Sequence, residues 1–244
     1  MVDLAFADPS LAQLYDVLNP WRPCDEFYLD LVMRATSVLD VGCGTGTLLR
    51  RARQAGHVGR LCGLDPAAAM LNQAREQPDV EWVLGDLTSR SWRAEFDLVV
   101  MTGHAFQVLL TDDEIRANLA AVRDALADSG RFAFETRNPL VRPWQRWTPE
   151  QAVEVVDAAG ETVRVWHQVD HPVDGRLVTF TTTFDSPGRR TPRYSRSTLR
   201  FVGRDELSAF LSAAGFAVEA QFGDWDRAPV TDASPEIITV ARRT

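Results

Sequence analysis

The sequence of 244 residues contains no lysine, so all 26 of its basic residues are arginine. This absence excludes a Walker lysine for nucleotide phosphates, a Schiff-base lysine and a lysine general base. Cysteine is also scarce, because only Cys24, Cys43 and Cys62 occur and they are widely spaced. An odd, scattered set fits a reducing compartment better than a disulfide framework, so we expect a cytoplasmic protein.

Long apolar runs and excess positive charge are missing too. No apolar stretch approaches the roughly 18 residues that span a membrane, and the first residues lack the basic and apolar regions of a signal peptide. The net charge of −8 disfavours a nucleic-acid partner. We interpret the one basic strip as a solvated strand and loop; it comprises Arg189, Arg190, Arg193, Arg196 and Arg200.

The most informative segment is Val38–Gly46, which reads Val-Leu-Asp-Val-Gly-Cys-Gly-Thr-Gly. An apolar strand enters a turn with glycine at three alternate positions, and an amphipathic helix follows. Bare backbone beside a helix N-terminus is how an open α/β sheet holds a nucleoside-bearing cofactor. A nicotinamide oxidoreductase is the weaker interpretation, because the third glycine comes one position too early for G-x-G-x-x-G and Asp40 lies inside the strand.

This motif resembles the first motif of the class I S-adenosylmethionine-dependent methyltransferases. Further landmarks follow in the family's order over residues 36–138 and 199–244: an acid ends the next strand at Asp65, and Gly85-Asp86-Leu87 ends the third. The resemblance implies S-adenosylmethionine as cofactor, S-adenosylhomocysteine as product, and a ribose contact for Asp65. The cofactor residues expected on this basis are Asp40, Gly42, Cys43, Gly44, Gly46, Asp65, Pro66, Met70, Asp86, Leu87 and Thr102.

The hydrophobic pattern predicts an α/β protein with a Rossmann-like seven-stranded sheet and helices on both faces. From about residue 153 the period changes to two, which indicates an antiparallel β-sheet lid inserted after the fifth strand. We expect an N-terminal helical cap over residues 1–35, the cofactor-binding domain over 36–148 and 199–244, and the insert over 149–198. The insert serves as a substrate lid or as a dimer contact, so we expect a monomer or a homodimer.

Aromatic residues of the leading segment, Tyr15, Trp21 and Tyr28, are candidates to cover the cofactor, since leading helices often do so in the resembled family. Packing of these rings against the sheet is the alternative interpretation. A helix is predicted over residues 9–18 and a second over 25–34. The acids Asp112, Asp113 and Glu114 resemble a cation site, but we interpret them as helix-capping residues and expect no metal.

Turns after the fourth and fifth strands are expected to face the substrate. His104 is the candidate general base, because its ordinary pKa of about 6.5 suits proton removal at neutral pH; a structural or cofactor-facing role is the alternative. Arg137 is suited to bind a substrate carboxylate, or else to pair with an internal acid. The expected substrate residues are Phe106, Glu135, Asn138, Trp144, Trp147 and Trp225.

The resulting hypothesis is a methyltransferase that acts on an oxygen or nitrogen of a small organic molecule by in-line displacement. A hydroxyl nucleophile needs a base, whereas a neutral amine does not. The alternative is a protein that binds S-adenosylmethionine or S-adenosylhomocysteine without methylating, or a different catalyst on the same scaffold. His167 shares a strand face with three valines and is expected to be a hydrogen-bonded core histidine.

Overall fold

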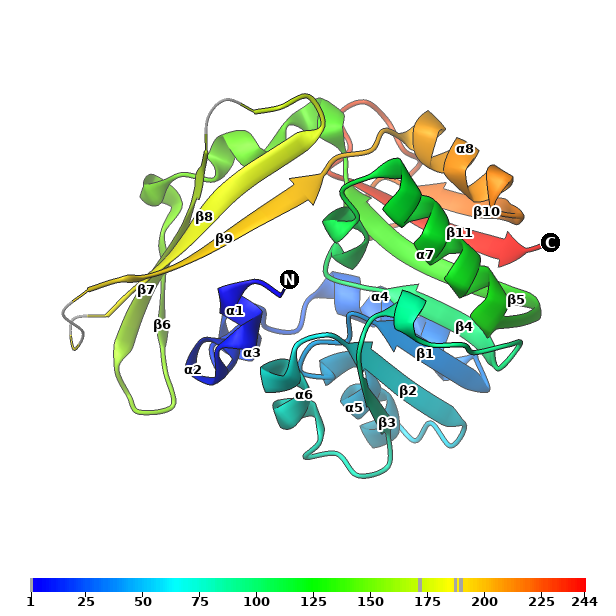
Figure 1. The fold of residues 1–244 in the computed structure, drawn as a ribbon, viewed down its shortest axis with the longest axis horizontal. Coiled ribbons are helices and arrows are strands. Elements are labelled where there is room, and N and C mark those ends of the chain that lie inside the picture. The colour runs from blue at the N-terminus through cyan, green and yellow to red at the C-terminus, as the bar shows by residue number, and fades with distance from the viewer. Residues whose placement is uncertain (1, 171–172, 187, 189–190) are drawn as a thin grey trace.

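The computed structural model describes residues 2–170, 173–186, 188 and 191–244, which form a large and a small β-sheet (Figure 1). The large sheet has the strand order β10-β11-β5-β4-β1-β2-β3; β1 to β5 run parallel, and β11 is antiparallel to both neighbours. The predicted seven-stranded α/β fold is therefore confirmed. Its strands are β1 (Ser37–Val41), β2 (Arg60–Asp65), β3 (Glu81–Leu84), β4 (Phe96–Met101), β5 (Leu126–Arg137), β10 (Phe216–Phe222) and β11 (Glu236–Arg243).

Two apolar clusters hold helices on the two faces of the large sheet. Helices α4 (Pro23–Met33) and α5 (Thr47–Gln54) cover one face, and α7 (Asp112–Ala125) and α8 (Arg204–Ala213) cover the other. Alternate residues of each strand enter opposite clusters, as in β1, where Val38 packs under α4 and Leu39 under α7. The helix α6 (Ala68–Ala74) packs at the β2–β3 edge.

Of the three acids at the start of α7, Glu114 takes part in the helix cap, as predicted. Thr111 Oγ1 accepts a hydrogen bond from Glu114 N, while Glu114 Oε2 accepts from Thr111 N and Leu110 N. Asp112 and Asp113 both pair with Arg116 one turn later. Cap and side-chain pairing thus account for the charges of all three acids.

The small sheet has the antiparallel order β6-β7-β8-β9. Its strands are β6 (Val153–Val156), β7 (Thr162–Val169), β8 (Leu177–Asp185) and β9 (Arg193–Arg200), reached from β5 through short 3₁₀ turns η3 (Pro139–Val141), η4 (Pro143–Arg146) and η5 (Pro149–Gln151). The period-two pattern predicts three of these strands as separate elements; β6 is too short to show a period of its own.

The helix predicted over residues 9–18 is two short helices in the structure, α2 (Pro9–Ala12) and α3 (Tyr15–Leu18), and a further short helix, α1 (Leu4–Ala7), precedes them. Asp8 separates α1 from α2, because its carboxylate accepts from the backbone N–H groups of Ser10 and Leu11 and caps α2. These helices lie between the small sheet and α6 (Figure 1).

Contacts on both sides hold this leading segment. Leu11 and Leu14 pack against Val163, Val165 and Phe184 of the small sheet. On the other side, Ala12 and Tyr15 pack with the Met70 cluster of α6. The segment therefore joins the insert to the large-sheet domain.

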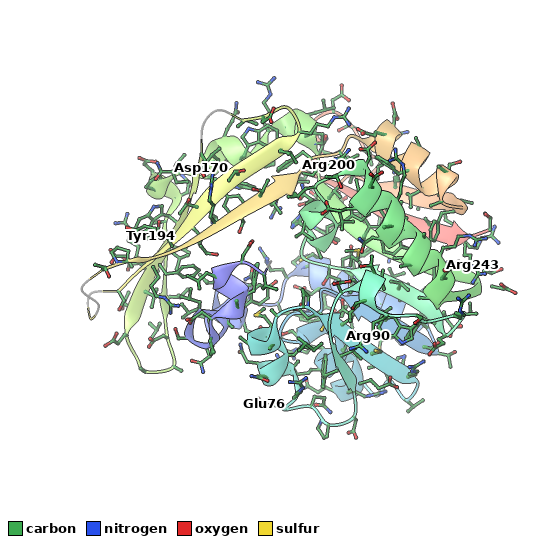
Figure 2. The ribbon with its side chains drawn as sticks, viewed as in Figure 1. Glu76, Arg90, Asp170, Tyr194, Arg200 and Arg243 are labelled. Carbon is green, nitrogen blue, oxygen red and sulfur yellow. The ribbon has the colours of Figure 1, made fainter. Side chains whose placement is uncertain are left out.

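The basic strip is ion-paired, and for Arg200 the expectation of a solvated side chain is wrong. Arg200 is 6% exposed and its Nη2 lies 2.6 Å from Asp112 Oδ1, where β9 returns toward α7 (Figure 2). Arg193 pairs with Asp8, and Arg196 pairs with Asp170 at 2.9 Å. Arg189 and Arg190 lie outside the described residues.

Candidate active site at the carboxyl edge of the large sheet

The glycine turn follows β1 with all three glycines at positive φ: 76° at Gly42, 56° at Gly44 and 75° at Gly46. Gly46 and Gly44 lack a side chain for different structural reasons. A Cβ on Gly46 would come within 2.3 Å of the Trp82 indole, so this glycine makes room for packing inside the protein. A Cβ on Gly44 would face Met70 Cε at 3.3 Å and Tyr15 Cε1 at 3.9 Å. Gly44 is therefore the bare backbone beneath the predicted cofactor-contacting side chains.

Two buried carboxylates flank this turn. Asp40 is 1% exposed, its Oδ1 has no hydrogen-bond partner among the described residues, and burial together with the Asp65 charge raises its pKa to about 8. Asp65 accepts from Gly44 N at 2.8 Å and from Ala67 N at 2.7 Å, and burial raises its pKa as well. A desolvated carboxylate without a partner is unfavourable alone and favours a cationic ligand.

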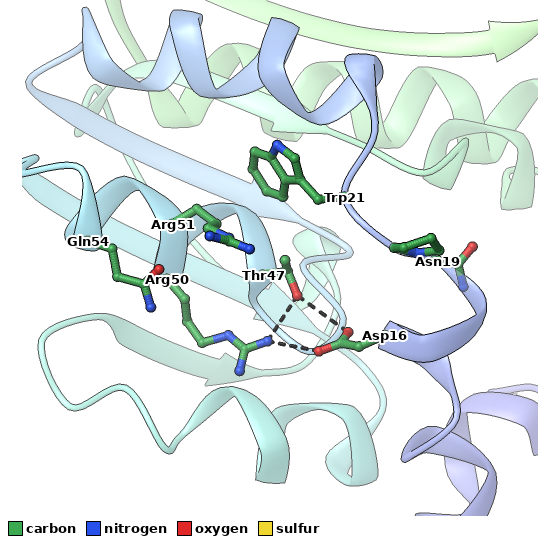
Figure 3. Close-up of a pocket in the computed structure, with 8 residues that line it drawn as sticks. Asp16, Asn19, Trp21, Thr47, Arg50, Arg51 and Gln54 are labelled. Atoms are coloured by element: carbon green, nitrogen blue, oxygen red, sulfur yellow. Dashed lines mark hydrogen bonds and ion pairs between the residues drawn. The ribbon is translucent and has the colours of Figure 1, made fainter. Parts of the chain in front are cut away.

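Helix α3 covers the turn from the N-terminal side. The Tyr15 ring lies against Gly44, and its hydroxyl approaches Gly103; burial raises the pKa of this tyrosine to about 12. The next residue, Asp16, accepts a hydrogen bond from Thr45 in the turn. Asp16 also accepts from Arg50 Nη2 at 2.9 Å (Figure 3). A cavity of about 410 Å³ adjoins this contact, with Trp21 on its wall (Figure 3).

A largely buried set of hydrogen-bonded polar side chains lies beside the turn, on the same carboxyl edge of the large sheet. We call this edge the rim. His104 has φ 64°, and its backbone N–H donates to Glu135 Oε1 at 2.8 Å. Glu135 Oε2 accepts from the hydroxyl of Tyr28, while His104 Nε2 lies 3.0 and 3.1 Å from the two carboxylate oxygens of Glu236. Burial lowers the pKa of His104 to about 3 and raises that of Glu236 to about 7, since it disfavours both charged forms.

Arg137 lies between this chain and the insert. Its Nη1 donates to Gln107 Oε1 at 3.0 Å, and the guanidinium lies 5.5 Å from the centre of the Trp147 ring. Among the described residues no carboxylate comes within ion-pair distance of it, so the alternative of an internal ion pair is wrong. Burial lowers the pKa of Arg137. A desolvated guanidinium bound only by a neutral amide retains donors for an anion.

Other predicted substrate residues are placed farther from this rim. Phe106 is 2% exposed and stacks on Phe134 in the core beneath it. Asn138 is also buried, and its side chain holds the 231–234 loop through a 2.9 Å bond to Ser234 O. Trp144 packs edge-to-face on Phe201, which directly follows β9.

The remaining candidates fall into three places. Asp86 is exposed and caps η1 (Leu87–Ser89), with its pKa lowered by hydrogen bonds from Thr88 and Ser89, whereas Leu87 is buried. Trp225 packs on Tyr28 and borders a groove of about 580 Å³. Cys43 is buried, Thr102 is partly buried and Pro66 is exposed.

Two residues of the site were not expected from the sequence. His167 is exposed instead of buried in the core; its Nδ1 lies 2.9 Å from Thr182 Oγ1, and its ring centre lies 5.4 Å from that of Phe180 and 6.2 Å from that of Trp147. Glu236 begins β11, which runs antiparallel to β5 and pairs Glu236 with Arg137. An acid at the first position of a final antiparallel strand is the signal that identifies this edge.

Comparisons with known proteins agree with this geometry. Residues 38–130 match the family described as a methyltransferase domain. The chain is 31% identical over 194 residues to dTDP-3-amino-3,4,6-trideoxy-alpha-D-glucopyranose N,N-dimethyltransferase from Streptomyces venezuelae, covering 76% of this chain and 77% of that protein. The S-adenosylmethionine-bound CalS10, an amino pentose methyltransferase from Micromonospora echinaspora, superposes with a TM-score of 0.70 at 26% identity, covering 95% and 97% of the two chains.

A more distant structure supports the fold alone. The CcbJ methyltransferase from Streptomyces caelestis gives a TM-score of 0.75 at 20% identity, covering 96% of this chain and 97% of that one. Nearly the whole chain is covered in these structures, so the likeness includes the insert as well as the large sheet.

Proposed function

Because the chain belongs to the class I S-adenosylmethionine-dependent methyltransferases, we propose that it methylates the amino nitrogen of a small polar acceptor of the amino-sugar type. The predicted enzyme class and cofactor are confirmed, as is a small-molecule activity. The choice of nitrogen is our own inference. Two relatives, from Streptomyces venezuelae and Saccharopolyspora spinosa, are named as sugar N,N-dimethyltransferases, which supports it.

The single observation that carries the proposal is the charge imbalance of the rim. Burial raises the pKa values of the carboxyl groups of Asp40, Asp65, Glu135 and Glu236, and the charges of Glu135 and Glu236 act on the buried guanidinium of Arg137. S-adenosylmethionine carries a sulfonium and an ammonium group, so it supplies positive charge that this rim lacks. The amino group of the acceptor would add further positive charge, which is compatible with the same surplus of carboxylates.

We assign the cofactor to the glycine turn. Gly44 carries no side chain, Asp40 Oδ1 has no partner among the described residues and would accept from the cofactor's ammonium group, and the neighbouring Asp65 would hold the ribose hydroxyls. Tyr15 and Met70 close over this position from α3 and α6. When bound, the cofactor supplies an electrophilic methyl group; the protein's own residues align the acceptor and exclude water.

We assign the acceptor to the space between His104, Arg137 and the insert. His104 is placed to receive the proton of the acceptor's ammonium group, which frees the nitrogen lone pair for in-line attack. The Arg137 guanidinium, with Trp147 over one face, suits an anionic group of the acceptor, and His167 supplies a further polar contact from β7.

We also infer the cellular location, the partners and the oligomeric state of the enzyme. Within the described part of the chain, no helix has the length and apolar character that crossing a membrane requires. The scattered cysteines support a cytoplasmic location, and the acidic balance supports a protein that works without nucleic acid or membrane, as a monomer or a homodimer.

Methyl transfer to a panel of small acceptors tests the proposal. Amino sugars, their hydroxyl analogues and sugar-free amines are incubated with the protein and methyl-labelled cofactor, and products are identified by mass spectrometry. We expect N-methylated amino sugars and stoichiometric S-adenosylhomocysteine. Methylation confined to the hydroxyl analogues would overturn the choice of nitrogen. Tight cofactor binding without turnover of any acceptor would favour the non-methylating alternative.

A further inference from the structure

The amine acceptor proposed above raises the question of how its proton is removed at a desolvated histidine. We propose that Glu236 is a positioning residue that fixes the tautomer of His104, so that His104 Nδ1 is the atom that takes the acceptor's proton. This inference rests on the proposed function and adds a residue, a tautomer and an atom to it.

The geometry of the pair supports this assignment. Both Glu236 oxygens lie within 3.1 Å of His104 Nε2, and the side chains are only 14% and 20% exposed. Above its pKa of about 7, Glu236 is ionised and can only accept, so Nε2 then carries the hydrogen. The neutral ring then has its lone pair on Nδ1, for which the described residues provide no hydrogen-bond partner. Nδ1 is therefore the basic atom.

The backbone of His104 is held in place for this purpose. A φ of 64° is unfavourable for a residue with a side chain, and such strain persists only where surrounding contacts enforce it. Here the enforcing contact is the 2.8 Å bond from His104 N to Glu135, whose other oxygen is held by Tyr28. Glu135 and Tyr28 thus orient the backbone, while Glu236 orients the ring.

Protons and electrons balance without another reactant. The N–H bond of the acceptor's ammonium breaks and an N–H bond forms at His104 Nδ1. The freed lone pair forms the C–N bond as the methyl–sulfur bond breaks, and that electron pair stays on sulfur. Burial disfavours the imidazolium, and ionised Glu236 at hydrogen-bond distance from Nε2 offsets part of that cost. The other charged groups acting on the pair are Arg137, Arg22, Glu135 and Asp224.

The test compares pH profiles of kcat/KM for the wild type, His104→Asn and Glu236→Gln. Asparagine tolerates a positive φ better than most residues, so His104→Asn preserves the backbone. Glu219→Gln is the control, because Glu219 on β10 pairs with Arg131 of β5 and Arg242 of β11 and lies outside the rim. Below the acceptor's pKa we expect about 100-fold loss in His104→Asn, the usual size of a general-base effect. The loss should shrink to within about tenfold above that pKa, where the free amine is abundant.

Two results would overturn the inference: variant profiles that run parallel to the wild type, or a Glu236→Gln profile identical to that of Glu219→Gln. A second readout needs no acceptor. Above the Glu236 pKa of about 7, nitrogen NMR of the His104 ring in the wild type should show the hydrogen on Nε2, with that preference lost in Glu236→Gln; a hydrogen on Nδ1 in the wild type under these conditions contradicts the proposal. If the acceptor panel instead shows hydroxyl methylation, the choice of amine fails while the NMR result still decides the role of Glu236.

Discussion

The glycine turn and the four-stranded insert both approach the same rim, but different contacts hold them there. Backbone groups fix the turn: its glycines take positive φ, and Gly44 N donates to Asp65. Side chains fix the insert, through Trp147 against Phe180 and through Leu11 and Leu14 of the leading segment. Backbone shape tolerates few residue types, whereas apolar packing accepts many. The cofactor side of the rim is thus constrained more tightly than the acceptor side.

The largest effect is expected when Gly44→Ala is compared with Gly175→Ala. The two glycines have almost the same φ, 56° and 55°, but a Cβ on Gly175 would have no neighbour within 4 Å, whereas one on Gly44 would face Met70 and Tyr15. Both variants bear similar backbone strain of about 1 kcal/mol. We expect calorimetry to show at least about 30-fold weaker S-adenosylhomocysteine binding for Gly44→Ala and no change for Gly175→Ala. Equal effects would mean that strain alone is responsible.

The Asp40→Asn substitution tests separately what Asp40 contributes to cofactor binding and to the stability of the ligand-free protein. Because the folded pKa of about 8 exceeds the ordinary value of 3.8, the folded protein holds this proton more tightly. The contribution of Asp40 to the free energy of unfolding is therefore greatest below pH 4 and falls as the pH rises to about 8. We expect the ligand-free variant to become more stable than the wild type as the pH rises from about 5 to about 9, in urea titrations.

The same substitution should weaken cofactor binding at least about tenfold at about pH 8.5, because the charge that faces the cofactor's ammonium is gone. Calorimetry across pH measures this. If the variant is less stable at every pH, or if it binds the cofactor normally, the Asp40 carboxylate does not bind the cofactor's ammonium group.

On the acceptor side, Arg137→Gln should raise the acceptor KM about 10- to 100-fold, the size of one charge-assisted hydrogen bond. Cofactor affinity should stay within about twofold, since Arg137 lies on the insert side of the rim. Arg137→Lys keeps the positive charge but lacks the paired N–H donors of the guanidinium, so its acceptor KM should lie between those of the wild type and Arg137→Gln. Steady-state kinetics with each ligand varied in turn provide the measurement. Equal losses for both ligands would remove the distinction between the two sides.

Asp16→Asn has the smallest expected effect. Its carboxylate joins α3 to Thr45 and Arg50, but the side chain is 42% exposed, so the interaction is weak. We expect S-adenosylhomocysteine to dissociate about two- to fivefold faster in stopped-flow measurements. Asp30→Asn is the control, because Asp30 on α4 is similarly exposed and pairs with Arg34 and Arg227, away from the glycine turn. An unchanged dissociation rate would show that α3 does not limit release.

The cofactor side was predictable because its signals are local. The alternate glycines, the acid inside β1 and the acid at the end of β2 lie close together in the chain, between Asp40 and Asp65, and the strand order follows from the βα alternation. Helix α7 was equally predictable, since its cap and apolar face are both encoded within it.

The acceptor side was less predictable because its contacts join distant segments. Glu236 meets His104 across 132 positions, and Tyr28 meets Glu135 across 107. The exposed state of His167 depends on how Trp147 and the leading helices cover the small sheet, which no period within β7 reveals. Phe106 follows the rim turn in sequence, yet η2 (Ala105–Val108) directs its ring into the core.

The leading segment has a kinetic consequence for turnover. One run of short helices places Tyr15 on the glycine turn and Leu11 on the small sheet, so it cannot move away from one without disturbing the other. On the proposed placement of cofactor and acceptor, we therefore expect that exchange of spent cofactor for fresh also opens the compartment that would hold the methylated product. Both products would then leave in a coupled event, and a second methylation of the same nitrogen would require the acceptor to be captured again.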